Sequence, residues 1–251
     1  MSRTDRPVLG VIEGDRTTLV VDAGNSAAHA RQLAETMAAK GLRPLGRADM
    51  IALTHWHWDH VFGAAHLPAA VIASRATDAM LGVMAGWRWD DAALDERVAA
   101  KTEIAFCRTR IRRELPEPRT VRIRRADRTI DGPVDIDLGG VTARLIPVGG
   151  DHAPDSIVVF VPEEKVLFLS DCAYPDIYHG PQRYDAAVLL PLLDRLSALD
   201  ADVLLWGHDR TPMPRAAFLR FADVCRIVAA GGDVPGDEDA AWLRPRLAAG
   251  R

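Results

Sequence analysis

Short apolar runs alternate with one amphipathic stretch over the first 75 residues. Paired runs around the tight Gly14-Asp15 turn are typical of two adjacent strands. The next segment has a helical pattern that Asn25 or Ser26 can cap and Gly41 can end. Two more short apolar runs suit a sheet that is covered on both faces. The expected strands are residues 7–14, 17–24, 48–54 and 69–74, and the expected helix is residues 25–41.

The rest of the chain first gives helical patterns and then returns to strands. Residues 75–115 have apolar markers at helical spacing, and we expect a helical insertion there. Pro191 lies in a later helical pattern, where it either kinks the helix or marks its first turn. The Gly/Asp/Ala-rich tail from about residue 233 is expected to be loosely held. The other expected strands are 120–125, 134–140, 141–148, a hairpin over 155–171 and 201–208, and the other expected helices are 184–200 and 214–232.

These elements predict one α/β domain over residues 1–251, with mixed sheets. The 48% hydrophobic content is ordinary for a globular protein, and the net charge of -4 suggests no dominant polyanionic partner. No apolar run approaches the roughly 20 residues that cross a bilayer, and the start of the chain lacks a signal-peptide core. Three widely spaced cysteines argue against a disulfide framework. We therefore expect a cytoplasmic protein with no membrane partner.

Three of the eight histidines gather directly after the apolar run 48–54. His55 and His57 are two residues apart, so in a loop or strand they point the same way and can hold one metal ion. Asp59 and His60 follow directly and can face a second ion. Imidazole and carboxylate suit zinc, and also iron, manganese or cobalt. Four ligands are too few for two ions, so other parts of the chain must contribute.

Three further candidate ligands each follow an apolar run at the point where polar residues begin. They are His152 after 141–148, Asp171 after the second half of the hairpin, and His208 at the end of 201–208. Strand ends at one edge of the sheets are where layered α/β folds build their sites. We do not expect His29, which should lie on a solvated helix face, to be a ligand, nor His66 or His179.

With these residues in their order, the chain resembles the metallo-β-lactamase superfamily. The segment His55-Trp56-His57-Trp58-Asp59-His60 matches the HxHxDH motif of that family, and the turn beginning at Asp22 is similar to its Asp-Thr-Gly turn. The resemblance runs from about residue 8 to residue 210 and implies an αββα sandwich of two mixed β-sheets flanked by helices.

The resemblance also implies how the ligands are shared. One ion would be held by His55, His57 and His152, the other by Asp59, His60 and His208, and both by Asp171. A water or hydroxide between the two divalent ions, which we expect to be zinc, would be the nucleophile. The resulting prediction is a binuclear hydrolase that cleaves a carboxylic ester, lactone, thioester or amide bond of a small molecule.

Several details bear on the branch of the family. Asp171 stands where some true β-lactamases use cysteine, and we interpret the adjacent Cys172 as a small buried residue. The HxHxDH motif is complete, whereas iron redox members replace its second histidine. Tyr174 lies three residues after Asp171, as in the branch that opens N-acyl-homoserine lactones, and could donate a hydrogen bond to an oxyanion. Asp59 and Tyr174 are therefore the candidate catalytic residues, with Tyr178 and Tyr184 as weaker candidates for the same donor role.

Two other functions stay open. Nine arginines stand against three acids between Arg108 and Arg128, which is a feature of a nuclease or phosphodiesterase. A solvated helix and an edge strand explain the same arginines, and we do not expect a nucleic-acid partner. A regulatory protein that binds metal without turnover is the third hypothesis. The insertion, with Trp87 and Trp89, could line the substrate site or form the surface of a homodimer.

Overall fold

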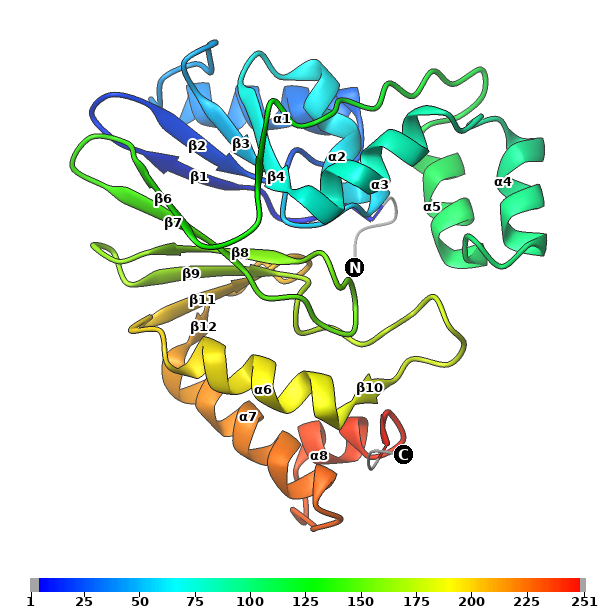
Figure 1. Ribbon diagram of the computed structural model, residues 1–251, viewed down its shortest axis with the longest axis vertical. Coiled ribbons are helices and arrows are strands. Elements are labelled where there is room, and N and C mark those ends of the chain that lie inside the picture. The colour runs from blue at the N-terminus through cyan, green and yellow to red at the C-terminus, as the bar shows by residue number, and fades with distance from the viewer. Residues whose placement is uncertain (1–4, 249–251) are drawn as a thin grey trace.

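The protein is built from two facing β-sheets with helices on both outer sides (Figure 1). The structure, a computed structural model, describes residues 5–248. A core of apolar side chains fills the space between the sheets, with Leu19 and Val21 on one side and Leu145 and Val159 on the other. Two further apolar cores lie between each sheet and its helices. The αββα sandwich expected from the sequence is confirmed.

The first sheet has the strand order β1-β2-β3-β4-β5. Its first two strands pair antiparallel around the Gly-Asp turn, and the remaining pairs are parallel. The central strands are buried on both faces, which is why their sequences are continuous apolar runs. The strands are β1 Gly10–Glu13, β2 Thr18–Val21, β3 Met50–Ala52, β4 Ala70–Ser74 and β5 Arg128–Ile130.

The second sheet has the order β12-β11-β9-β8-β7-β6. Its pairs are antiparallel except for β9 and β11, which run parallel. A separate small sheet pairs β10 with β13. The strands are β6 Val134–Asp137, β7 Thr142–Pro147, β8 Ile157–Val161, β9 Val166–Ser170, β10 Tyr184–Asp185, β11 Val203–Trp206, β12 Met213–Pro214 and β13 Leu247–Ala248.

Helices cover the outer faces of both sheets (Figure 1). Helix α1 lies over the first sheet, while α6 and α7 lie over the second, and α4 and α5 of the insertion project beyond the first sheet. The helices are α1 Ala27–Ala39, α2 Trp58–Val61, the 3-10 helix η1 Phe62–His66, α3 Arg75–Ala85, α4 Asp91–Ala99, α5 Ala105–Glu114, α6 Ala186–Ser197, α7 Arg215–Ala229 and α8 Glu238–Leu243. Within residues 5–248, no helix is long and apolar enough to cross a membrane.

Two local expectations need correction, and for Pro191 one of the two alternatives is excluded. Residues 120–125 form no strand; Val121 and Ile123 pack on the core in an extended segment, because β5 already occupies that edge of the sheet. His29 is buried instead of solvated, since the first turn of α1 packs closely against Gly24. Pro191 lies inside α6 and not in its first turn.

The carboxyl-terminal segment from residue 233 is also more ordered than its composition predicts. It forms α8 and β13, and Ala240, Leu243 and Leu247 are buried in the core beside α7. The apolar side chains that anchor it are few and separated by polar residues, so their pattern is weak in the sequence. Its last three residues, 249–251, lie outside the described part of the chain.

Candidate metal centre

The predicted ligands meet where strands of both sheets end. His55 and His57 follow β3, and Asp59 and His60 lie in the short helix α2. The other ligands come from the second sheet: His152 follows β7, Asp171 follows β9 and His208 follows β11. All seven side chains are buried or nearly so, with at most 12% of the side chain exposed, at His208. The two facing sheets thus each supply part of one compact cluster.

The described residues contain three groups of three that could each hold an ion, of which one, His55, His60 and Asp171, overlaps the other two. The first triad is His55, His57 and His152, and the second triad is Asp59, His60 and His208; within each, the ligand atoms all lie within 4.8 Å of one another. Asp171 stands between them. Its Oδ2 atom lies 3.4 Å from His152 Nε2 of the first triad, and 3.3 Å from both His60 Nε2 and His208 Nε2 of the second. One carboxylate therefore faces both triads.

The residues fit divalent cations by their unsatisfied atoms as well as by their type. His55 Nε2 is buried and has no hydrogen-bond partner among residues 5–248, and His60 Nε2 is buried and faces the carboxylates of Asp59 and Asp171, each 3.3 Å away. Buried polar atoms without partners are rare, because each leaves its desolvation cost uncompensated. An imidazole nitrogen without a partner, beside imidazoles and carboxylates at close range, is what a metal site shows when its ligands point at an ion.

The electrostatics divide the cluster into two halves. Burial, and then the neighbouring imidazoles, hold the pKa of His55 and of His57 well below the usual histidine range, so both are neutral ligands at pH 7. Burial opposes the charged form of His60, but Asp59, Asp22 and Asp171 raise its pKa well above that range. His208 behaves like His60: burial is outweighed by Asp171 and Asp59, which raise its pKa to about 10. Without an ion, the positive charge in the second triad is therefore carried by the protonated imidazoles of His60 and His208.

A buried network around Asp22 orients the second triad. His60 Nδ1 donates to Asp22 Oδ2 over 2.8 Å, and the same oxygen accepts from the hydroxyls of Thr54 and Ser170, each over 3.0 Å. Thr54 N donates to the other oxygen, Oδ1, over 2.8 Å. Asp22 and Ser170 both adopt positive φ angles, 62° and 49°, a conformation that costs energy away from glycine. Two of the five non-glycine residues with positive φ among residues 5–248 thus belong to this network.

The first triad is oriented through its Nδ1 atoms too. His55 Nδ1 lies 3.0 Å from the Thr54 hydroxyl, and His152 Nδ1 donates to the carbonyl of Pro175 over 3.1 Å. These bonds leave Nε2 of each imidazole free to face an ion. The sequence showed Asp22 only as part of a turn motif, and its role could not be deduced there because its partners Thr54, His60 and Ser170 come from three separate segments.

Tyr174 lies beside the cluster, as its spacing from Asp171 suggested. Its ring stacks on Trp206 with centroids 5.0 Å apart, and lies 6.0 Å from the ring of His152 and 6.3 Å from that of His208. Burial, and then Asp171, raise the pKa of Tyr174, so the phenol keeps its proton near neutral pH. That proton is available for donation.

The two weaker tyrosine candidates use their hydroxyls elsewhere. The Tyr178 ring lies 5.1 Å from that of His57, but its hydroxyl faces Cys107 Sγ of α5 at 3.6 Å. The Tyr184 hydroxyl donates to the carbonyl of Ala173 over 2.9 Å. Tyr178 therefore lines the cluster with its ring and contacts the insertion with its hydroxyl. Tyr184 is a core residue.

The other residues considered from the sequence lie outside the cluster. Cys172 is buried in the core between the second sheet and its helices. His29, His66 and His179 belong to none of the metal-competent groups, and His179 pairs with Asp176 at the surface. Trp58 is buried against Phe62, whereas the half-buried Trp56 borders His57.

The insertion is packed through its tryptophans. Trp89 is buried with its ring 4.8 Å from that of Phe62, and the guanidinium of Arg97 lies 4.7 Å from the ring centres of both Trp87 and Trp89. Such cation–π contacts gain strength when they are shielded from water. The part of the insertion that carries Trp89 is thus attached to the core beside α2.

Several solved structures have the same fold. The chain superposes on a metallo-beta-lactamase from Pontibacter korlensis with a TM-score of 0.57 and 16% identity, over 85% of this chain and 84% of that one. A metallo-beta-lactamase family protein from Thermus thermophilus gives 0.59 and 21%, over 96% and 83%. The stereoselective inverting sec-alkylsulfatase Pisa1 from Pseudomonas sp. gives 0.67 and 18%, over 99% of this chain but only 46% of that one.

A search of curated proteins found no match to the chain. The sequence model of the metallo-beta-lactamase superfamily matches residues 7–208, a span that begins just before β1 and ends at the ligand His208. Most of the chain lies in that match, including the whole first sheet, the second sheet except β12, and every residue of the two triads. The chain therefore belongs to the metallo-beta-lactamase superfamily, whose members are mostly metal-dependent hydrolases.

Proposed function

We propose that this protein is a binuclear metal-dependent hydrolase that cleaves a carboxylic ester, lactone, thioester or amide, with lactones favoured. The position of Asp171 carries the proposal, because its Oδ2 lies 3.3–3.4 Å from ligand atoms of both triads. A carboxylate so placed can hold two cations at a fixed separation. Two divalent ions, which we expect to be zinc, supply an activated water and a Lewis acid when bound.

The side chains of the chain would divide the remaining work. The neutral imidazoles of the first triad bind a cation without adding charge, while Asp59 and Asp171 offset much of the charge of the pair. Asp59 can also orient the attacking water by accepting a hydrogen bond. Tyr174 can donate its phenol proton to the substrate oxygen as that oxygen becomes negative. Burial of the cluster excludes other water and strengthens each of these interactions.

A phosphodiesterase or nuclease is the alternative that the arginines suggested. Five of the nine, Arg108, Arg112, Arg119, Arg124 and Arg125, form ion pairs with aspartates. Paired arginines attract a polyanion less, because their charge is already balanced. This pairing supports a small carbonyl substrate over nucleic acid. The three cysteines are buried free thiols, which supports a reducing, cytoplasmic location.

A hydrolysis screen tests the proposal. Zinc- and manganese-loaded protein is assayed on lactones, β-lactams, glutathione thioesters and a chromogenic phosphodiester, with a secondary alkyl sulfate added because of the fold shared with the sulfatase. We expect the highest kcat/KM on a carbonyl substrate, and its loss in chelator and in Asp171→Ala. Fastest turnover of the phosphodiester would favour the alternative. Tight binding of two ions with no turnover of any substrate would favour a regulatory protein.

A further inference from the structure

Asp155 connects the backbone of the first triad to the start of α3. It lies three residues after His152 in the loop between β7 and β8, and only 6% of it is exposed. Its Oδ2 accepts hydrogen bonds from Trp56 N over 3.0 Å and from the Thr77 hydroxyl over 2.7 Å. Trp56 is the residue between His55 and His57. Asp155 Oδ2, in the loop that carries His152, therefore contacts the short segment that carries His55 and His57.

The segment that carries His55 and His57 depends on such contacts. It lies between the end of β3 at Ala52 and the start of α2 at Trp58, so its backbone groups are satisfied by separate contacts and not by one regular hydrogen-bond ladder. The Trp56 N–H is satisfied by the Asp155 carboxylate, and the carbonyl of Thr54 accepts from Ile157 N over 2.8 Å. The ligand segment and the loop of His152 are thus joined by two bonds, one on each side of His55.

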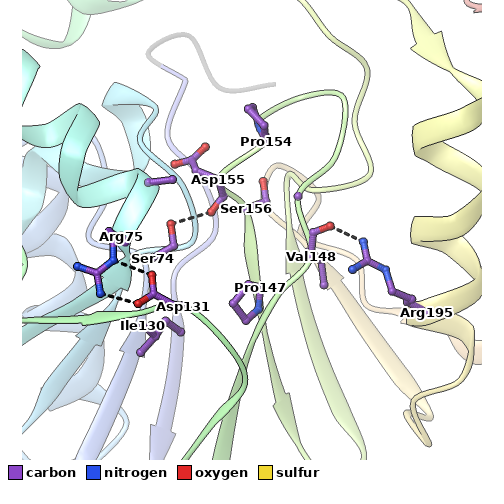
Figure 2. Close-up of a pocket in the computed structure, with 12 residues that line it drawn as sticks. Ser74, Arg75, Ile130, Asp131, Pro147, Val148, Pro154, Asp155, Ser156 and Arg195 are labelled. Carbon is purple, nitrogen blue, oxygen red and sulfur yellow. Dashed lines mark hydrogen bonds and ion pairs between the residues drawn. The ribbon is translucent and has the colours of Figure 1, made fainter.

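Helix α3 gives Asp155 a rigid support. Ser74 caps this helix by accepting from Thr77 N over 3.0 Å, and its hydroxyl also donates to the Asp155 carbonyl over 3.1 Å. Figure 2 shows that hydroxyl directed at the Asp155 backbone, with the Asp155 carboxylate turned away from Val148 and Arg195. Since Ser74 already caps the helix, the carboxylate is not required for that purpose. Its use is the bond to Trp56.

We propose that Asp155 is the positioning residue of the first triad: its carboxylate fixes the segment of His55 and His57 relative to His152. The inference rests on the binuclear centre of the proposed function but not on any substrate. The second triad is oriented by Asp22 instead, so loss of the Asp155 contact should weaken one ion and spare the other. Supporting groups of this kind typically contribute 10- to 100-fold to metal affinity.

Zinc titration of the chelated protein, followed by calorimetry, tests this role. We expect Asp155→Ala to weaken one of two equivalents by about 10- to 100-fold and to leave the other unchanged. Asp155→Asn keeps an acceptor oxygen for Trp56 N and should restore most of the affinity. Thr77→Val is the matched control, because it removes the second bond to the same oxygen while the contact with Trp56 stays. If Asp155→Ala does not fold, Asp155→Ser, whose hydroxyl is too short to reach, takes its place.

Two variants that each keep only one triad complete show which of the two zinc sites is weakened. In His208→Ala, where the first triad stays complete, Asp155→Ala should weaken zinc further; in His152→Ala, where the second triad stays complete, it should not. Equal loss from both sites, no loss from either, or a Thr77→Val variant that matches Asp155→Ala would overturn the role of Asp155. No assay of turnover enters, so a failed substrate screen contradicts the proposed activity and leaves this inference standing.

Discussion

Asp22 accepts the Nδ1 hydrogen of His60 over 2.8 Å, and this bond directs His60 Nε2 towards Asp59 and Asp171, each 3.3 Å away. His60 thus faces Asp22 with Nδ1 and both Asp59 and Asp171 with Nε2, and only one orientation of its ring makes all three contacts. Asp22 itself is fixed by Thr54 and Ser170, which lie on different sheets. The second triad is therefore set by residues from both halves of the sandwich.

The first prediction follows from this contact. In Asp22→Asn, one acceptor oxygen becomes an amide that faces hydrogen-bond donors, so at least one bond of the network is lost. We expect metal affinity to fall by roughly 10- to 100-fold, as for other groups that support a metal ligand. Asp49→Asn is the control, because Asp49 bonds the backbone of Gly46 and Thr18 away from the centre. Equal affinities in the two variants, measured by calorimetry, would contradict the prediction.

The second prediction separates Asp171 from its neighbour. Asp171→Ala removes the carboxylate shared by the triads, so metal content should fall together with activity. Cys172→Ser changes a thiol in the apolar core, where burial raises its pKa and keeps it from acting as a thiolate ligand. The serine variant should keep its metal and lose only some thermal stability. Elemental analysis after gel filtration decides; metal loss in the serine variant alone would reverse the assignment.

The third prediction concerns protons. With no ion bound, His60 and His208 are charged at pH 7, because Asp59 and Asp171 outweigh burial and raise the pKa of His208 to about 10 and that of His60 well above its usual range. An ion that binds these imidazoles must displace one proton from each. Affinity at the second triad should therefore rise with pH through the range from 7 to about 10. Calorimetry at pH 7 in buffers of different ionisation enthalpy should show this release, and a buffer-independent enthalpy would contradict it.

The raised pKa values of His60 and His208 have the opposite effect on the folding stability of the chelated protein, which falls as pH rises. A raised histidine pKa stabilises the fold fully below the unfolded value of about 6.5, and this stability is lost as pH rises through the folded value. The chelated protein should therefore lose thermal stability from pH 7 to 10. The zinc-loaded protein should lose less, because the cation replaces those protons.

Tyr178 provides the fourth prediction. Its hydroxyl faces Cys107 of α5, while its ring lies beside His57. Tyr178→Phe keeps the ring and removes the contact with α5, so we expect kcat to change by less than about 3-fold and the insertion to open more often. Hydrogen exchange of residues 105–114 should become faster, in line with weaker local stability. Unchanged exchange there, or a large loss of kcat, would show that the hydroxyl acts elsewhere.

The sequence allowed the proximity of the candidate ligands to be predicted because they lie at or just beyond strand ends, and strand ends converge in a layered fold. It did not reveal Asp22 or Asp155 as supports, because each acts on backbone or side chains distant in the sequence. The strand predicted over residues 120–125 was wrong for a related reason. Alternation of apolar and polar residues indicates an extended segment, but whether a neighbouring strand is free to pair with it depends on the whole sheet. The prediction that His29 is solvated was wrong because burial of a polar side chain depends on tertiary packing, which a helical pattern does not encode.

The last prediction concerns Tyr174. Its ring lies beside those of His152 and His208, and burial raises its pKa so that the phenol keeps its proton. If that proton stabilises a developing oxyanion, Tyr174→Phe loses transition-state binding and little ground-state binding. We expect kcat on the best ester or lactone to fall about 10-fold, near the lower end for such donors because a metal shares the charge, with KM and metal content nearly unchanged. The ring, and its stacking on Trp206, stay in place.

A charge-neutralised arginine is the matched comparison for Tyr174→Phe. Arg122 is exposed and belongs to the arginine-rich segment, so Arg122→Gln should lower hydrolysis of a phosphodiester, and more at low salt, if that substrate is bound through surface charge. On a carbonyl substrate the same variant should match the unmodified protein, because neither the triads nor Tyr174 is changed. Both variants are assayed on both substrates at two salt concentrations. Full turnover of the carbonyl substrate by Tyr174→Phe would make Tyr174 a packing residue on Trp206 and remove the main support for a lactonase.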